Sequence, residues 1–571
     1  MASTDPKHDT SETQSAGSEM RSGLTRRDLL RGGVAAGVVG GIGLGSVYFG
    51  YGSSVRDPVR VGVIGTGDEG GVLMGAINPD YVRVAAIADI RPYNIYRAFH
   101  GDSSSTSALA ARPGLISKYG YADEADARRD IAVYSDQYED LLDNPDIEGV
   151  IIALPLHLHA EASIKAMRKG KHVLCEKLMA HSVGQCKEMA RTADETNTLL
   201  AVGHQRHYSI LYDNAREMIR RGMIGDLHHI RAQWHRGNLP GRDSWQQPLP
   251  DDSLRREMDR YATESAALFE QLAAEDSQWN SGASDRRDMA EAKRQLAKMR
   301  LLDATIDPAK YGYRAPRLTL SDGQVKNFSP HEELIRWRLW NRTGGGLMAE
   351  LGSHQLDAAS IFISALRDDG KKVRPLSVTA VGGRHLFPPD RDAADHVYCN
   401  FEFPAPDYDR DPNKKIVVSY SSINGNGFGG YGEVVMGTKG TIVIDREKEV
   451  ELYRKDAPTS IKADKTAGPV LDTTESGAYA AAETKAATGP VSRGYTEEIE
   501  HWAWCIRNPG PENVPRCGPK VALADAVIAL VANQAINSQN RIMFDPGWFD
   551  PDSDATPEGE APNVTRKEYT I

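Results

Sequence analysis

Three glycines with phosphate-binding spacing stand near the start of the patterned part of the chain. In the segment VGVIGTGDEGG, Gly65, Gly67 and Gly70 follow a short apolar run and precede a helical pattern. Such spacing permits a tight turn, close approach of a pyrophosphate to the backbone, and close packing of helix on strand. The free N–H groups and the dipole of the helix N-terminus then favour an anion. The segment, with Thr66 in its turn, therefore predicts a dinucleotide site.

Charged residues near this turn bear on which dinucleotide binds. Asp89 ends the next apolar run, where a carboxylate can accept hydrogen bonds from the ribose diol of NAD. Arg91 could instead bind the 2′-phosphate of NADP. NAD is slightly favoured and NADP stays open. The carboxylates of Asp68 and Glu69 are unfavourable beside an anion, so both are expected to face solvent.

The elements that must position these residues alternate between short apolar strands and helical patterns. Strands are expected at 60–64, 82–88, 132–134, 149–154, 172–175 and 199–202. Strands that alternate with helices are typical of βαβ units in a parallel sheet. Residues 58–203 are therefore predicted to form an α/β domain, a Rossmann doubly wound parallel sheet.

The rest of the chain mixes helices with longer β-rich segments. Strands are expected at 228–234, 376–381, 397–403, 416–421, 432–436 and 441–444. Residues 204–544 are predicted to form an α+β domain with a large, mostly antiparallel open sheet. A charge-rich helical insertion is expected near 248–325, exposed to solvent. The acidic tail, 545–571, is expected to be an extended wrap or disordered.

The first 57 residues predict a disordered segment followed by a signal or linker. Arg26 and Arg27 precede a glycine-rich run that carries no charge between Arg31 and Arg56. This layout is typical of a twin-arginine export signal. It predicts a periplasmic protein that meets the twin-arginine translocation machinery and stays membrane-tethered if the signal is not cleaved. The alternative is a chance arginine pair beside a linker.

Composition narrows the class of protein. A chain of 571 residues is too long for one hydrophobic core, so at least two domains are expected. The net charge of −11 argues against a nucleic-acid partner. The five cysteines lack the spacing of a disulfide framework or a zinc site, so no metal is expected and buried apolar roles are favoured.

Three further strings make a family resemblance specific: ALPLHLHAEASIKAMRKGKHVLCEKLMAH, VGHQRHYSILYDNAREMI and RTGGGLMAELGSHQLDAA. Together with the glycine motif, in this order, they resemble the Gfo/Idh/MocA oxidoreductases, the family of glucose-fructose oxidoreductase and inositol dehydrogenases. The resemblance covers roughly 59–239 and 327–542, and leaves out the signal, the insertions and the tail. It implies a homo-oligomer formed through the open sheet face.

The resemblance suggests three catalytic residues. The family's Glu-Lys-Pro pattern appears as Glu176-Lys177-Leu178, which places Lys177 beside the nicotinamide and the reacting hydroxyl. A buried ammonium there can polarise the oxygen and relay its proton. His354 falls on the family's acid–base position, where an imidazole suits proton transfer near neutral pH. Glu350 stands where Asp is usual, and either joins the catalysis, orients His354 or binds a substrate hydroxyl.

Further positions carry over as binding residues. The cofactor contacts implied by the resemblance are Pro155, His157, His159, Glu176, Lys177 and Gln205. The candidate substrate contacts are Arg206, Arg236, Trp340 and Asn341, because aromatic faces and guanidinium groups suit carbohydrates, although each could equally be core packing. His157 and His159 lack a third neighbouring ligand, which argues against a metal pair.

These observations predict an exported oxidoreductase. It would transfer a hydride between a tightly bound NAD(P), loaded before export, and a hydroxyl-bearing carbon of a sugar, polyol or sugar derivative. The alternative enzyme is a redox-assisted glycoside hydrolase that uses bound NAD without net redox change, as some relatives of the family do. A non-catalytic binding module is the alternative from another class, and the presence of both Lys177 and His354 argues against it.

Overall fold

The computed structural model describes residues 44–52, 55–274, 281–454, 461–464, 483–485 and 493–570. These residues belong to one compact unit, Gly41–Ile571. The expected arginine pair and most of the glycine-rich run lie outside the described residues. Within that run only the short helix α2 (Leu44–Phe49) and a few residues after it are described.

A six-stranded parallel sheet forms the first layer of the structure. Its strands are β1 (Val59–Ile64), β2 (Val82–Ala88), β3 (Ala132–Tyr134), β4 (Gly149–Ile152), β5 (His172–Cys175) and β6 (Leu200–Val202). The order is β3-β2-β1-β4-β5-β6, with every neighbouring pair parallel. All residues of β4 are buried, as expected for a strand covered by helices on both faces. The doubly wound fold predicted from the sequence is confirmed.

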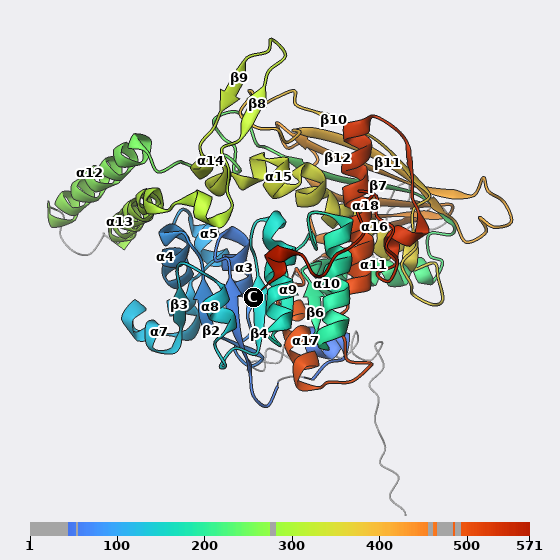
Figure 1. Cartoon of the computed structure of the whole chain (residues 1–571), viewed down its shortest axis with the longest axis horizontal. Coiled ribbons are helices and arrows are strands. Elements are labelled where there is room, and N and C mark those ends of the chain that lie inside the picture. The colour runs from blue at the N-terminus through green and yellow to red at the C-terminus, as the bar shows by residue number, and fades with distance from the viewer. Residues whose placement is uncertain are drawn as a thin grey trace, which may run out of the picture. The chain divides into compact units, whose positions relative to one another are not determined.

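Helices cover this sheet on both sides (Figure 1). They include α3 (Asp68–Ala76), α4 (Pro92–His100), α5 (Thr106–Ala111), α6 (Leu115–Tyr119), α7 (Glu124–Asp130), α8 (Glu139–Leu142), α9 (His159–Arg168) and α10 (Val183–Thr196). A helix from much later in the chain, α17 (Tyr495–Arg507), also packs on β1, β2 and β5. Its Trp502 is fully buried, and a Cβ added at Gly149 would lie 2.8 Å from that ring. One helix from the predicted second domain therefore packs against the sheet of the first.

The second layer is a ten-stranded sheet in the order β17-β16-β15-β14-β13-β7-β12-β11-β10-β18. Its strands are β7 (Leu227–Arg236), β10 (Ser377–Gly383), β11 (His396–Pro404), β12 (Lys415–Asn424), β13 (Tyr431–Gly437), β14 (Gly440–Asp445), β15 (Glu449–Arg454), β16 (Ile461–Asp464), β17 (Glu483–Lys485) and β18 (Ile542–Met543). The pairing is antiparallel except between β7 and β12 and between β16 and β17. Every second residue of β12 is buried, so one face of the sheet meets the core.

The covered face packs against the helices of the second domain, among them α11 (Ile210–Arg220), α16 (Ser353–Ser364) and α18 (Pro519–Ser538). By length and composition α18 could cross a membrane, but 67% of its apolar window is buried inside the protein. It contacts α10, α16 and β10, so it is a core helix that joins the two layers.

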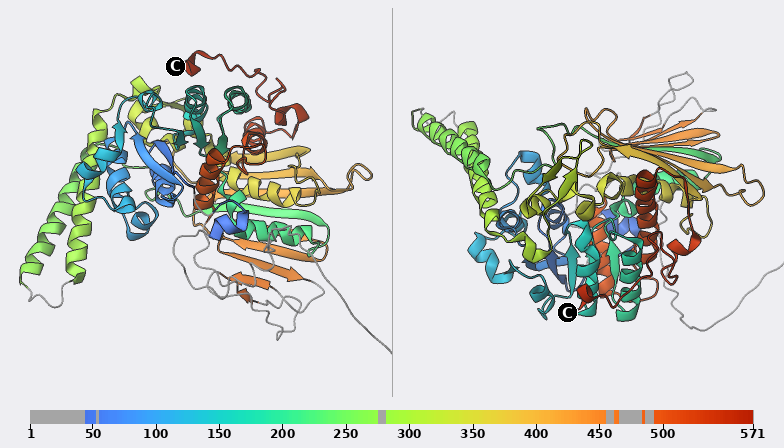
Figure 2. Two further views of the ribbon diagram at one scale, coloured as in Figure 1. Left: turned by 90° about the horizontal axis from the view of Figure 1, so that it is seen from below. Right: turned by 45° about the horizontal axis from the view of Figure 1, so that its top comes forward.

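The insertion forms a pair of long helices, α12 (Asp252–Ala274) and α13 (Ser281–Leu302), which lie side by side (Figure 2). The sequence predicts an exposed excursion here. The structure differs from this prediction at the C-terminal end of the insertion, where α13 packs on α4 of the first domain. The insertion therefore carries residues to the first domain as well as to solvent.

The acidic tail is an extended wrap over α9 and α10. The ammonium of Lys187, on α10, donates hydrogen bonds to the carbonyl oxygens of Gly547, Ser553 and Ala555 at 2.7–2.8 Å. Lys187 is fully buried by the contact. This arrangement ties the tail to the first domain.

Replacing Lys187 by methionine is expected to lower the free energy of unfolding by about 3 kcal/mol, because three carbonyl acceptors lose a charged donor. Chemical denaturation and limited proteolysis of the tail measure the effect. Lys169→Met, which removes only a surface pair with Asp143, is the control and should cost less than about 1 kcal/mol. Equal stability of the two variants would contradict a role for the Lys187 contacts.

Candidate active site

The glycine turn between β1 and α3 has the geometry of a phosphate cradle. Gly65 has a φ of +87°, and a Cβ at Gly70 would lie 2.1 Å from the carbonyl oxygen of Gly65. Both positions therefore require glycine. A Cβ at Gly67 would meet no described protein atom closer than Asn94 Nδ2 at 3.7 Å. The space beside Gly67 belongs to a cavity, so the turn fits a dinucleotide that approaches its backbone.

The cavity has a volume of about 1070 Å³ and runs from this turn into the second domain. Of the expected site residues, it is lined by Gly65, Gly67, Asp89, Arg91, Pro155, His157, His159, Glu176, Lys177, Arg236, Glu350 and His354. The structure therefore brings the predicted catalytic residues and most of the predicted cofactor contacts to one space. Gly70 and Thr66 do not line the cavity: Gly70 packs against the Gly65 carbonyl, and the backbone N–H of Thr66 donates to Asp89.

Asp89 links the turn to the loop after β2. Its Oδ2 accepts hydrogen bonds from the backbone N–H of Thr66 at 2.8 Å and from Asn94 Nδ2 at 3.1 Å. Its Oδ1 accepts from the backbone N–H of Arg91 at 2.9 Å. The carboxylate is thus held at the cavity wall, where a ribose diol could still donate to its remaining lone pairs.

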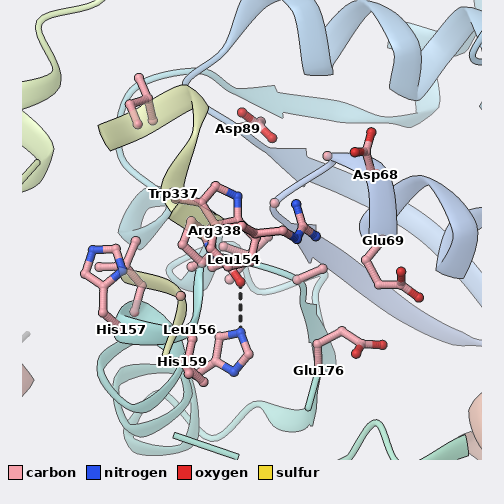
Figure 3. Close-up of a pocket in the computed structure, with 18 of the residues that line it drawn as sticks. Asp68, Glu69, Asp89, Leu154, Leu156, His157, His159, Glu176, Trp337 and Arg338 are labelled. Carbon is pink, nitrogen blue, oxygen red and sulfur yellow. Dashed lines mark hydrogen bonds between the residues drawn. The ribbon is translucent and has the colours of Figure 1, made fainter. Parts of the chain in front are cut away.

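The two carboxylates after the turn are partly exposed, as expected, but they face the cavity. Asp68 and Glu69 both line the cavity, on the same side as Glu176 in the view of Figure 3. Asp68 accepts from Arg97 at 2.7 Å and from Gln247 at 3.1 Å. Burial would raise the pKa of Asp68, but Arg97 lowers it below its usual range. The ion pair with Arg97 offsets the negative charge of Asp68, which would otherwise be unfavourable beside a bound anion.

Lys177 reaches the cavity just after β5. Its ammonium donates to the backbone carbonyl oxygen of Glu350 at 2.8 Å. The Glu350 side chain turns instead to Arg338, whose Nε lies 2.8 Å from Oε1. Burial alone would raise the pKa of Glu350, but Arg338, Lys177 and Arg236 lower it to about 2. Glu350 therefore stays ionised at neutral pH and holds Lys177 through its backbone.

His354 lies one turn after Glu350 at the start of α16. Its ring is 8% exposed and lies 5.2 Å from the ring of Trp234, tilted by 37°. Burial lowers the pKa of His354 well below 6.5, and the charges of Lys177 and Arg206 lower it further. The imidazole is therefore neutral at neutral pH and available as a proton acceptor.

The two histidines after β4 differ in their surroundings. His157 packs edge-on against Tyr313 of the insertion, and burial lowers its pKa to about 3. One ring nitrogen of His159 lies 2.8 Å from the carbonyl oxygen of Leu154 (Figure 3). The other lies 2.8 Å from the carbonyl oxygen of Leu178. His159 thus joins the loops after β4 and β5, so it positions Lys177 more than it offers a nitrogen to a ligand.

Glu176 precedes Lys177 and is buried. Its Oε2 accepts from the Lys177 backbone N–H at 3.1 Å, while Oε1 has no hydrogen-bond partner among the described residues. Burial and then Glu69 raise the pKa of Glu176. An unpartnered buried carboxyl oxygen at the cavity wall is suited to meet a donor from a bound ligand.

Four expected site residues lie elsewhere. Gln205 is buried beside Tyr495, and Arg206 forms an ion pair with Glu447, to which its Nε donates at 2.8 Å. Trp340 packs in the core against Phe328, and Asn341 binds Asp392. None of the four lines the cavity, so the geometry does not support them as cofactor or substrate contacts. Their side chains pair with protein groups instead.

Residues that the motifs did not indicate complete the wall. They are Trp337 and Arg338 from the segment before α15 (Asn341–Gly344), Lys310, Tyr311 and Tyr313 from the insertion, and Glu568 and Tyr569 from the tail. Arg338 lies over the Trp337 ring at 4.2 Å (Figure 3). No sequence signal distinguishes these residues from surface ones, because each reaches the cavity through a long-range fold contact.

A buried charged cluster lies behind His354. Asp357 pairs with His207 at 2.9 Å and with Lys372 at 2.9 Å, and Lys372 also contacts Asp525. His204, Asp357 and Asp525 have the proximity of metal ligands. The ammonium of Lys372 already stands between the two carboxylates, where a cation would bind. These contacts give Asp357 a structural role behind His354.

The fold and the cavity define an α/β protein with a parallel six-stranded sheet, a mixed ten-stranded sheet and a glycine turn whose geometry fits a dinucleotide. Residues 59–204 match the model of the Gfo/Idh/MocA oxidoreductase family, described as having an NAD-binding Rossmann fold. The family resemblance seen in the motifs is therefore confirmed for the first domain. The match covers that domain and does not extend into the second.

Curated relatives match over limited stretches. An uncharacterized oxidoreductase of Streptococcus pneumoniae is 31% identical over 118 residues, 21% of this chain and 30% of that protein. A glycosyl hydrolase family 109 protein of Solibacter usitatus is 26% identical over 220 residues, 37% of this chain and 46% of that protein. The chain thus spans less than half the length of these relatives.

One solved structure resembles both domains. An inositol dehydrogenase homolog of Azotobacter vinelandii, complexed with NADH and myo-inositol, has a TM-score of 0.52 and 13% identity. The likeness covers 86% of this chain and 98% of that one. At this identity it shows the shared fold.

Proposed function

We propose that this chain is an NAD-dependent oxidoreductase that acts on a hydroxyl-bearing carbon of a sugar or polyol. One observation carries the proposal: the glycine turn, Lys177 and His354, from separate elements, line a single cavity. A bound nicotinamide would supply the hydride acceptor. The family match of the first domain supports this cofactor.

The chain's own groups suit removal of a hydroxyl proton. The ammonium of Lys177, held by the Glu350 carbonyl, can donate to the substrate oxygen and stabilise negative charge on it. The neutral imidazole of His354 can accept the proton. Glu350 is paired with Arg338 and ionised, so we assign it a positioning role and no proton transfer.

The substrate end of the cavity suits a polyhydroxylated ligand. Trp234 lines the cavity beside His354, with Tyr431 stacked on its ring at 4.6 Å and Arg236 at 5.7 Å from the ring centre. Arg236 and Arg338 also line the cavity. Aromatic faces pack on the apolar side of a sugar, while guanidinium groups donate to its hydroxyls.

Native mass spectrometry of the purified chain, followed by a panel of sugars and polyols with an artificial electron acceptor, tests the proposal. A bound nicotinamide dinucleotide and turnover of at least one polyol are expected. A chain that neither carries nor binds such a nucleotide would refute it.

Replacing Gly67 by alanine is expected to weaken NAD binding at least about tenfold, because the new methyl group would stand where the pyrophosphate approaches. The protein itself has room for it, and the changed helix cap costs at most about 1 kcal/mol. Calorimetric titration and thermal unfolding measure both effects. Gly70→Ala is the comparison, since its Cβ overlaps the Gly65 carbonyl and should destabilise the fold as well. NAD affinity unchanged in Gly67→Ala would contradict the cradle.

A second candidate is a redox-assisted glycoside hydrolase. The glycosyl hydrolase family 109 relative favours it, because the match extends beyond 200 residues. Transient oxidation of a ring hydroxyl would need the same proton-transfer groups. Incubation with an aryl glycoside separates the two functions: phenol release without net NADH supports hydrolysis, and net NADH from free sugars supports the dehydrogenase.

We also propose export through the twin-arginine route and assembly into a homo-oligomer. The arginine pair at 26–27 before an uncharged run supports export, and the open face of the ten-stranded sheet supports assembly. Cell fractionation of a variant with both arginines changed to lysine tests the first. Light scattering tests the second.

A further inference from the structure

We infer that Asp303, at the end of the insertion's second helix, makes the cofactor site selective for NAD against NADP. The inference rests on the proposed function and names which dinucleotide the site takes. Asp303 binds two groups that could otherwise bind the 2′-phosphate of NADP, and the inference rests on these two contacts.

The first such group is the guanidinium of Arg91. Arg91 lines the cavity two residues after Asp89, where an arginine can bind the 2′-phosphate of NADP. In the structure Arg91 Nε donates to Asp303 Oδ2 at 2.8 Å. The Asp303 side chain is 0% exposed and that of Arg91 11% exposed. The charge of Arg91 is therefore already paired in a site that excludes most water.

The second group is the N-terminus of α4, which begins beside the same loop. Pro92 has no N–H, and the N–H of Asn94 donates to the carbonyl oxygen of Arg91. The N–H of Tyr93 is the donor left over, and it donates to Asp303 Oδ1 at 3.2 Å. A helix N-terminus normally attracts an anion through such free donors and its dipole. Here a carboxylate of the chain itself takes that place.

Neighbouring contacts hold Asp303 in this position. Arg300, in the last turn of α13, donates to the hydroxyl of Tyr93 at 2.6 Å and lies 4.4 Å from the centre of its ring. Arg97 lies over the same ring at 4.4 Å. The insertion therefore contacts α4 through Arg300 as well as through Asp303.

The charge balance of the loop then opposes a phosphate. Asp89 and Asp303 bring two carboxylates to the loop, and its one guanidinium, that of Arg91, is already paired with Asp303. A 2′-phosphate would bring further negative charge to partly buried carboxylates, where repulsion is screened less than in water. The 2′-hydroxyl of NAD brings no charge and can donate to Asp89.

The test is a competition read by native mass spectrometry. The full chain is incubated with equimolar NAD and NADP after exchange of resident nucleotide, and the two bound forms are compared. Wild type is expected to hold NAD over NADP by at least about a hundredfold. Asp303→Asn keeps the size and the acceptor for Tyr93 but frees Arg91, and should shift the ratio at least about tenfold toward NADP.

Matched variants make the result specific. Asp307→Asn makes the same chemical change at an exposed residue of the insertion and should leave the ratio unchanged. The double variant Arg91→Ala/Asp303→Asn should lose the gain in NADP binding. Asp303→Ser, which also removes the charge, replaces Asp303→Asn if thermal unfolding shows that the latter does not fold.

The outcomes separate the two hypotheses. A wild-type chain that binds NADP as well as NAD, or a folded Asp303 variant with an unchanged ratio, overturns the role of Asp303 and leaves the oxidoreductase proposal standing. A chain that binds neither dinucleotide refutes the proposed function itself.

Discussion

Lys177→Met is expected to lower kcat by about 10³-fold while the chain still folds and still binds the nucleotide. Methionine matches the length and apolar stem of lysine but cannot donate to the substrate oxygen or to the Glu350 carbonyl, which the ammonium contacts at 2.8 Å. Initial rates on the best polyol, together with nucleotide content from native mass spectrometry, measure the effect.

Lys326→Met is the control for Lys177→Met, because Lys326 is exposed on β9 (Val325–Asn327), outside the cavity. Its kcat should stay within about twofold of wild type. A Lys177→Met chain that keeps more than a tenth of wild-type kcat would remove Lys177 from the reaction. Loss of both nucleotide and activity would assign it to binding alone.

His354→Asn is expected to lower kcat by about 10²- to 10³-fold, since asparagine keeps a polar side chain but cannot accept the proton. The wild-type rate should also depend on pH in a defined direction. The pKa of His354 lies well below 6.5 because of burial and the charges of Lys177 and Arg206. Only the neutral ring is a base, so wild-type kcat/KM should fall as pH drops through that low pKa and stay level from pH 6.5 to neutral pH.

The pH profile is the readout that a merely structural role of His354 would not change. In His354→Asn the acid limb should disappear while the residual rate persists. His228→Asn, at an exposed histidine of β7, should keep both the rate and the limb. If the acid limb persists in the His354→Asn variant, a group other than His354 is responsible for the limb.

Different ion pairs surround the two ends of the cavity, the end at the glycine turn and the end at the second sheet. Near the glycine turn, the Asp68 carboxylate is paired with Arg97 and the Asp303 carboxylate with Arg91. Near the second domain, Glu350 is paired with Arg338, which leaves Lys177 to act on the substrate. Each paired carboxylate removes a charge that would otherwise compete for the ligand. In the function proposed above, the pairs that surround the cavity set its selectivity, while Lys177 and His354 carry out the proton transfer.

Sequence patterns by themselves determined the first domain and the centre of the site. Strand and helix periodicity and glycine spacing are local properties, so the parallel sheet and the turn at Gly65 and Gly70 could be predicted within a few residues. Lys177 and His354 could be assigned because they belong to motifs that resemble a known family.

Tertiary structure alone decided which partners these residues have. Arg91 and Asp303 stand 212 positions apart, and Lys177 and Glu350 173 apart, so no local pattern relates them. Arg206 has the chemistry of a sugar-binding residue, yet it forms an ion pair with the buried carboxylate of Glu447. Whether a polar group meets a ligand or the protein depends on which element packs against it, and burial requires each such group to find a partner.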